Sequence, residues 1–252
     1  MFYAMKRYII FIMLLFFTAQ LTKAQLWRMK RYEATAGIGT TQFFGDIGGF
    51  SQTENILGIK DFSFRQTRFN MSTSLRYRIM EDVSVRVNFA FGYLRAIDTR
   101  GSNELRDFEA VTSIFEPSLI GEYYFIKNKT ENSYIFLKGG TNLAGTLISS
   151  LDFYVFAGFG GVSYMVKGND ALVARGMQSN GFALVLPVGV GTSFTYSPDF
   201  NFGIEIGGRY STTDYLDGYT SQYSKSNDVY YFLNATITYK INTGKNGLPS
   251  FR

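Results

Sequence analysis

The chain has 252 residues, no cysteine, no histidine and a formal net charge of +5. The lack of cysteine excludes disulfides, thiol catalysis and thiolate metal sites, and the lack of histidine removes the usual base of hydrolytic active sites. Lys6, Arg7 and Lys23 lie in a segment that we expect to be removed, which leaves a nearly balanced net charge of +2 and no argument for nucleic-acid binding.

Residues 1–24 have the pattern of a secretory signal peptide. The basic pair Lys6-Arg7 precedes an apolar stretch over 8–17, and the small residue Ala24 precedes the predicted cleavage site. The alternative is a helical transmembrane anchor, for which the apolar stretch is short. No later apolar run has the length of a helical span. We therefore expect an exported protein.

Apolar and polar residues alternate along most of the remaining chain, as they do in β-strands with two unlike faces. In 83–93 the odd positions are Val, Phe or Tyr, whereas the even positions include Arg86 and Asn88. In 151–166 both faces are apolar, so the sequence does not assign its facing. The same alternation predicts eight strands, over 32–41, 68–79, 83–93, 115–125, 151–166, 182–196, 202–211 and 229–241.

The length of these segments favours a membrane barrel over a soluble β-sandwich. They run for about ten to sixteen residues, whereas globular strands average about five or six and a tilted strand that crosses a bilayer needs roughly nine to eleven. A barrel also pairs every backbone hydrogen-bonding group, as lipid requires. We predict an all-β fold, an antiparallel transmembrane β-barrel of eight strands.

The predicted connections alternate between long and short, with one exception. Outer-membrane barrels place long loops outside and short turns in the periplasm, so both termini are expected to be periplasmic. The exception is 126–150, which is long where a short turn is expected; an extra hairpin there would make ten strands. The long connections are 44–67, 95–109, 167–181 and 212–228, and the short ones are 80–82 and 197–201.

Aromatic residues gather near the strand ends on the apolar face. Amphipathic rings prefer the headgroup level of a bilayer, and membrane barrels carry them as two girdles. The alternative is that the rings pack a soluble core. The residues are Tyr77, Tyr93, Tyr123, Phe125, Tyr196, Phe202, Tyr210, Tyr231 and Tyr239.

Charged residues recur on the opposite, inward face. Buried charges need partners, and an eight-stranded barrel is just wide enough for side chains to fill it. We expect a polar network that fills the lumen; a selective pore or proton path would need the same residues. The predicted interior network is Arg68, Arg76, Arg78, Arg86, Glu116, Glu122, Glu205 and Arg209.

The sequence offers no catalytic, cofactor or metal site. Asp214 and Asp217 could serve as a carboxylate pair or a cation site, but two acids are few for calcium, and Gly218 beside them indicates a turn. Glycine-rich stretches such as 37–42 lie inside alternating strands, where glycine relieves crowding. We expect a protein that is not an enzyme and binds no cofactor.

The expected domains are a signal peptide over 1–24, an outer-membrane barrel over 25–241 and a periplasmic C-terminal tail over 242–252. Gly244, Gly247 and Pro249 argue against strand pairing in the tail. The tail and the 126–150 connection share one side, where basic and apolar residues form a candidate docking patch for a partner. Its members are Lys127, Lys129, Tyr134, Phe136, Lys138, Phe251 and Arg252.

Several stretches carry a family resemblance. They are "GIGTTQFFGDIGG" (37–49), "EPSLIGEYYF" (116–125), "YSPDFNFGIEIGGRY" (196–210) and "DYLDGYTSQYSKSNDVYYF" (214–232). With them, nearly all of 31–252 resembles the Bacteroidota outer-membrane β-barrel family that includes the type IX secretion component PorG. The resemblance implies an outer-membrane protein that contacts periplasmic ring or lipoprotein subunits of that secretion machine, and it supplies no catalytic residues. The alternatives are a small outer-membrane channel or transporter, and a surface adhesin barrel.

Overall fold

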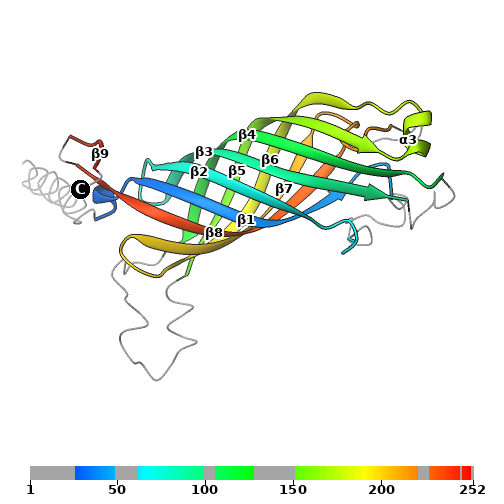
Figure 1. Cartoon of the computed structure of the whole chain (residues 1–252). Coiled ribbons are helices and arrows are strands. Elements are labelled where there is room, and N and C mark those ends of the chain that lie inside the picture. Colours follow the sequence, from blue (N-terminus) through cyan, green and yellow to red (C-terminus); the bar gives the residue numbers. More distant parts are fainter. Residues whose placement is uncertain are drawn as a thin grey trace, which may run out of the picture.

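A computed structural model describes residues 26–48, 62–98, 106–127, 151–220, 227–244 and 246–250. Eight antiparallel strands follow one another around a closed barrel, because β1 pairs with β8 as well as with β2 (Figure 1). They are β1 (Tyr32–Phe44), β2 (Arg68–Arg78), β3 (Val83–Ile97), β4 (Glu109–Ile126), β5 (Leu151–Gly168), β6 (Asn180–Thr195), β7 (Phe200–Ser211) and β8 (Val229–Thr243).

The predicted eight-stranded antiparallel barrel is confirmed. The ten-stranded alternative is wrong, because β4 pairs directly with β5 and leaves no place between them for another hairpin. Among the described residues, no helix is long and apolar enough to cross a membrane.

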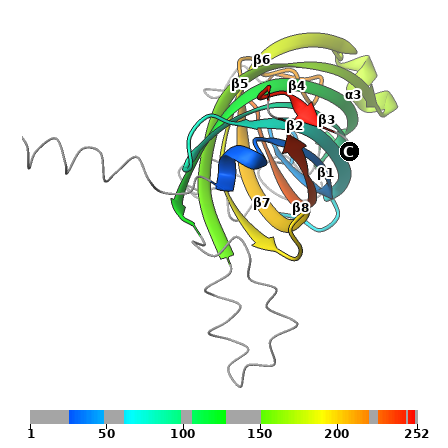
Figure 2. The same cartoon turned by 90° about the vertical axis from the view of Figure 1, so that its left-hand side faces the viewer.

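The two ends of the barrel differ in their connections. One end carries the tight turns 79–82 and 196–199, and we call it the short-turn end. It also bears the 3₁₀ helix η2 (Leu26–Met29) and the two-residue strand β9 (Pro249–Ser250), which face the viewer in Figure 2. The other end, which we call the long-loop end, carries the helix α3 (Asp170–Ala174) and the described loop residues 212–220 (Figure 1).

The barrel exterior is apolar along most of each strand. Val87 and Phe89 of β3 are 44% and 43% exposed, and Leu186 of β6 is 50% exposed. All nine aromatic residues predicted for the girdles are exposed as well. Soluble monomers rarely expose contiguous apolar patches beyond a few hundred Å², and here the charged side chains at mid-barrel, such as Arg86 and Glu205, point inward. This is the arrangement of a membrane-spanning barrel, in which the apolar face meets lipid.

The interior of β5 and β6 explains why 151–166 is apolar on both faces. Tyr154 and Phe156 point into the lumen and are buried, whereas Val155 between them is exposed on the outside. Room for the two rings comes from glycines on β6: a Cβ at Gly189 would lie 2.5 Å from the Phe156 ring, and one at Gly191 would lie 2.3 Å from the Tyr154 ring. These glycines therefore relieve crowding in a narrow lumen, as the sequence indicated.

The C-terminal tail corrects one expectation. It does pair as a strand, since Pro249 and Ser250 of β9 lie opposite Thr243 and Asn242. The turn between them uses Gly247, whose φ of +76° favours glycine. Pro249 is tolerated because β9 is an edge strand, where a missing N–H breaks no ladder.

Candidate functional site

The half of the lumen nearer the short-turn end is filled by ion pairs. Strand register sets their positions: Glu33 of β1 lies directly opposite Arg76 of β2, and Arg76 lies directly opposite Arg86 of β3. Two arginines opposite each other repel, so this register requires carboxylates close to both. The lumen supplies them from three other strands.

Arg76 and Arg78 share the carboxylate of Glu33. Arg76 Nη1 lies 2.7 Å from Glu33 Oε2, and Arg78 Nη2 lies 2.8 Å from Glu33 Oε1. Glu122 of β4 completes the group, with Oε2 2.7 Å from Arg76 Nε and Oε1 3.2 Å from Arg86 Nε. Glu122 therefore bridges the two facing arginines and relieves their repulsion.

A bidentate pair crosses the lumen from β3 to β7. Arg86 donates through Nη1 and Nη2 to the two carboxylate oxygens of Glu205, at 2.6 and 2.8 Å. Tyr154 of β5 donates its hydroxyl to the same Glu205 at 2.6 Å. Since β3 and β7 stand four places apart in a ring of eight strands, the pair spans the barrel. It ties opposite walls together.

A second crossing involves Glu116 of β4. Tyr230 of β8, also four places away around the ring, donates its hydroxyl to Glu116 Oε2 at 2.6 Å. Arg209 of β7 approaches the other oxygen, with Nε 3.7 Å from Glu116 Oε1. The Arg209 guanidinium also lies 4.1 Å from the centre of the Phe232 ring, a cation–π distance. This crossing joins the ionic half of the lumen to the apolar half.

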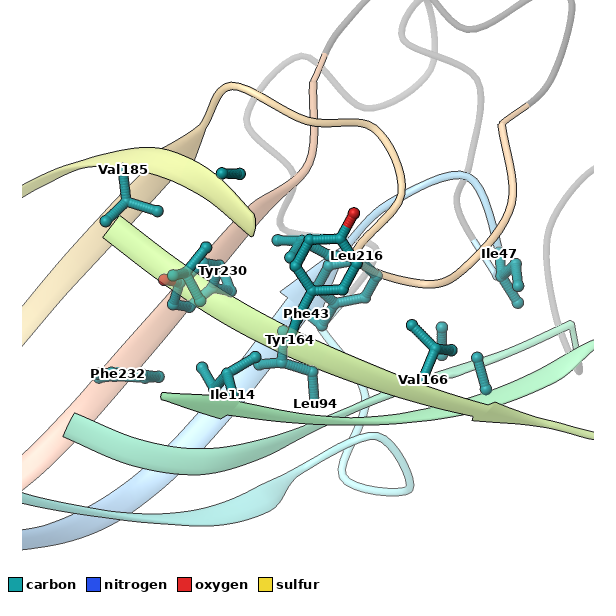
Figure 3. Close-up of a cluster of buried hydrophobic side chains, with 14 of the residues drawn as sticks. Phe43, Ile47, Leu94, Ile114, Tyr164, Val166, Val185, Leu216, Tyr230 and Phe232 are labelled. Carbon is teal, nitrogen blue, oxygen red and sulfur yellow. The ribbon is translucent and has the colours of Figure 1, made fainter. Parts of the chain in front are cut away.

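The half of the lumen nearer the long-loop end is packed with apolar side chains. Figure 3 shows part of this cluster, which includes Leu94, Ile114 and Tyr164 from the strands and Leu216 from the loop between β7 and β8. Leu216 is fully buried. Its carbonyl accepts a hydrogen bond of 2.5 Å from the Thr112 hydroxyl, and its N–H donates to Asp228 Oδ2 at 2.7 Å. The loop thus closes the lumen with an apolar plug.

The structure places seven of the eight predicted interior residues in the ion pairs of the lumen. They are Arg76, Arg78, Arg86, Glu116, Glu122, Glu205 and Arg209. Arg68 is a correction. It stands at the long-loop end of β2, where its Nη1 donates to the carbonyls of Arg65 and Thr67 rather than to a lumen carboxylate. Its position at the strand end lets the side chain leave the lumen for the rim.

Sequence reasoning omitted three members of the network: Glu33, Tyr154 and Tyr230. Alternation places Glu33 on the inner face, opposite Tyr32, so a signal was present. Alternation also places Tyr230 on the inner face of 229–241. Tyr154 carried no such signal, because inward and outward aromatic residues look alike along the apolar stretch 151–166. The role of the two tyrosines follows from hydroxyl groups that reach carboxylates on distant strands.

The acids of the 212–228 loop accept hydrogen bonds from neighbouring loop residues. Asp217 accepts from the N–H groups of Ile47 and Tyr219, both at 3.0 Å. Burial raises the pKa of Asp217 to about 7, and the charges of Asp46 and Asp214 add to that shift. Burial also raises the pKa of Asp228, to which the charge of Asp217 adds. Asp214 accepts a hydrogen bond of 2.5 Å from Thr220. Within the described ranges, no group of three or more His, Cys, Asp or Glu is placed to hold a metal ion.

Gly218, expected to supply the turn, has a φ of +80°. Beside it, Arg106 joins three loops at the long-loop end. Its guanidinium pairs with Asp98, with Nε 2.7 Å from Oδ2, and donates to the Asp46 carbonyl at 2.9 Å. It lies 5.0 Å from the centre of the Tyr219 ring. These contacts help to fix the loop that carries Leu216.

Of the predicted docking patch, only Lys127 falls within the described residues. Lys127 donates to the carbonyl of Glu81 in the turn between β2 and β3, which places it at the short-turn end. Lys129, Tyr134, Phe136, Lys138, Phe251 and Arg252 lie outside the described residues.

Comparisons with solved structures found small outer-membrane proteins. The neisserial surface protein A is 12% identical, with 83% of this chain and 96% of that chain covered and a TM-score of 0.46. The Escherichia coli outer membrane protein W is 14% identical, with 84% and 97% covered and a TM-score of 0.38. The outer membrane enzyme PagL is 12% identical, with 83% and 99% covered and a TM-score of 0.36.

At these TM-scores the likenesses do not bear on function, and the fold rests on the strand pairing of the barrel itself. No protein-family model matches the chain. No curated protein matches it either.

Proposed function

We propose that the protein is a non-enzymatic outer-membrane β-barrel that anchors a periplasmic assembly, of the type IX secretion or gliding kind that the sequence resemblance implies. The closed lumen is the observation that carries the proposal. Its ionic half is crossed by the Arg86–Glu205 pair and its apolar half is filled around Leu216. A barrel with a filled lumen acts through its surfaces.

The lumen also disfavours the channel alternative. A selective pore needs charged groups that can exchange a bound ion with their neighbours. Here Arg76 and Arg86 are 5% and 3% exposed and already face carboxylates at 2.6 to 3.2 Å. Buried pairs of this kind are costly to break, so ion passage would require the network to open.

An outer-membrane location is supported by the lipid-facing exterior and by the signal-like segment 1–24. In barrels of this class the short turns face the periplasm, and we assign the short-turn end to that side. An even number of strands leaves both ends of the barrel chain there. The long loops and the Leu216 plug then face outward.

The short-turn end offers an apolar surface for a partner. Met29, Met80 and Leu248 are 61–63% exposed there. They lie beyond the aromatic residues of the girdle at the short-turn end. Ile79 and Ile126 are exposed as well. Exposed apolar groups outside the lipid-facing band are the type of surface that partner proteins cover. This surface, together with the 126–150 connection and the tail, is the proposed docking site for ring or lipoprotein subunits.

The test uses one charge at each end of the barrel. Leu248→Asp places a charge at the short-turn end, and Val173→Asp places one on α3, where Val173 is 54% exposed. Two further variants delete 243–252 or shorten 128–149. We expect the Leu248 variant and at least one deletion to lose cross-linked ring or lipoprotein subunits and to reduce secretion, whereas Val173→Asp keeps both.

The membrane part of the proposal has its own readout. The wild-type protein should fractionate with the outer membrane and migrate differently on gels before and after heating. Recovery as a soluble periplasmic protein would overturn the outer-membrane assignment. Full secretion and unchanged partners in all four variants would overturn the anchoring role.

A further inference from the structure

A row of basic side chains crosses the exterior of the barrel at the long-loop end. Strand register places Arg95 of β3, Val111 of β4 and Lys167 of β5 directly beside one another. Outward-facing positions on these strands are the odd ones, so all three side chains start on the lipid side. The row lies close to the last paired residues of its strands.

Two more arginines join the row from the β2 side. Arg68 and Arg95 both donate to the same carbonyl, that of Arg65, at 3.1 and 3.5 Å. Their guanidinium groups are therefore neighbours, and Arg68 interacts electrostatically with Arg95 and Glu109. Arg65 itself is exposed. The guanidinium groups of Arg68 and Arg95 thus meet at one point of the outer rim, on the backbone of a third arginine.

The carboxylate that pairs with this group is Glu109. Its Oε1 accepts from Arg95 Nε at 2.9 Å, and the side chains are 26% and 42% exposed, Arg95 first. Exposed pairs of this kind are weak and exchange readily with solvent ions. Counted over the described residues of this patch, Arg65, Arg68, Arg95 and Lys167 outnumber Glu109, which makes the patch cationic.

A hollow with both apolar and polar lining lies below the row. It has a volume of about 450 Å³ and is lined by Phe91, Ser113, Phe115, Ser163, Met165 and Asn180, among others. Register places Ser113 beside Met165 and Phe115 beside Ser163. These two pairs lie two and four residues below the Val111–Lys167 pair, which is about 7 and 13 Å along the strands. The Ser113 hydroxyl donates to the Met165 carbonyl at 3.4 Å, so it already has a partner.

Exposed aromatic rings flank the cationic patch. Phe64 is 85% exposed, and its ring meets that of Phe62 edge to face at 5.3 Å. Tyr93 and Phe69 are exposed on the neighbouring strands. Aromatic rings of this kind mark the headgroup level of a bilayer, which puts the basic row at the depth of lipid phosphates.

We propose that this face of β2–β5 binds a phosphate-bearing membrane lipid, with its phosphate against Arg68, Arg95 and Lys167 and an acyl chain in the hollow. The planar guanidinium fork matches phosphate oxygens in a bidentate manner. The hollow has the size of ordinary ligand sites, which run from about 300 to 1,000 Å³. The surrounding bilayer delivers such a ligand directly to the lipid-facing side, whereas a free phosphate would leave the hollow empty.

Native mass spectrometry of the full mature chain in detergent tests the site. Four probes distinguish the contribution of the basic row from that of the hollow. They are dioleoyl phosphatidic acid, dioleoyl phosphatidylcholine, dioleoylglycerol and inorganic phosphate. We expect one phosphatidic acid to bind in preference to the other three. Equal binding of phosphatidylcholine or of dioleoylglycerol would overturn the role of the basic row. Equal binding of inorganic phosphate would overturn the role of the membrane as source.

Substitutions then assign the binding to residues. Arg95→Gln with Lys167→Gln should weaken phosphatidic acid binding roughly 30-fold, at about fivefold for each basic residue near a membrane surface. Arg175→Gln, an exposed arginine after α3 at the same end, is the matched control and should change nothing. Glu109→Gln should strengthen binding, a gain that misfolding would not produce. The proposal fails if the double variant behaves like Arg175→Gln.

A substitution that fills the hollow tests whether an acyl chain occupies it. Ser163→Phe should weaken binding of dioleoyl phosphatidic acid and leave the short-chain dihexanoyl form unaffected. Val155→Phe, on the outer face of the same strand but away from the hollow, should affect neither lipid. Equal binding of the long-chain lipid to both variants would show that no chain occupies the hollow.

Discussion

Loss of one partner of the Arg86–Glu205 pair should destabilise the barrel more than any surface ion pair does. The side chains are 3% and 9% exposed, Arg86 first, and two hydrogen bonds of 2.6 and 2.8 Å join them. Each charge-assisted bond contributes about 1.5–3 kcal/mol, and removal of one partner of a buried pair costs about 3–5 kcal/mol. Arg86→Met should therefore lower the free energy of unfolding by about 3–5 kcal/mol.

The two single substitutions should differ in size. Within the described part of the chain, Arg86→Met leaves the Glu205 carboxylate with the hydrogen bond from the Tyr154 hydroxyl at 2.6 Å and the more distant charge of Arg76. Glu205→Gln leaves Arg86 with a second carboxylate, Glu122, at 3.2 Å, and is the milder change. The double variant carries no uncompensated charge at this crossing, so it should recover much of the loss and reveal a coupling between the sites.

Urea unfolding in lipid vesicles, followed by far-UV circular dichroism and by heat-modifiable gel migration, measures these changes. Lys30→Gln is the control. Lys30 lies 2.6 Å from Asp199, the same length as the Arg86–Glu205 contact, but those side chains are 25% and 49% exposed. An exposed pair contributes about 0–1 kcal/mol. If Arg86→Met costs no more than Lys30→Gln, the lumen is hydrated and the argument from buried pairs is wrong.

Three further outcomes follow from the same structure. The purified protein should show negligible conductance in planar bilayers, and large steady single-channel currents would contradict a filled lumen. Phe89→Arg, near the middle of the lipid face, should lower the free energy of unfolding by about 2–4 kcal/mol and reduce the heat-modifiable folded fraction. Ile79→Arg, at the short-turn end, should lower it by about 0–1 kcal/mol. Equal effects of the two substitutions would mean that the faces or the depths are misassigned. The loop that carries Leu216 should loosen as pH rises from about 4 to about 7. Asp217 has a pKa of about 7 in the closed loop, against an ordinary value of about 3.9 for an exposed aspartate. Between these two pH values the closed loop keeps a proton that the open loop releases, so rising pH favours the open loop. Its protection from hydrogen exchange, corrected for the intrinsic rate, should be greatest below about pH 4, and Asp217→Asn should reduce this pH dependence; an unchanged profile in that variant would exclude Asp217 as the group responsible.

Alternation along the chain was enough to predict the strands, their number and which face of most of them meets lipid. A period of two residues assigns each side chain to one of two faces, and the length of each run separates a membrane strand from a globular one. The same alternation placed Arg76, Arg86 and Glu205 inside. It did not assign 151–166, because there the inner face packs apolar rings such as Tyr154 and Phe156 and so resembles the outer face.

Which inward residues meet depends on how the strands close into a ring. Arg86 and Glu205 are 119 residues apart, and their contact depends on closure of the ring between β1 and β8, which sets the height of each strand relative to the one across the lumen. Alternation carries no information on that height. Alternation predicts that Arg68 points inward, but the residue stands at the strand end and its side chain leaves the lumen at the rim. Leu216 belongs to a loop, where alternation makes no prediction, and it fills the lumen.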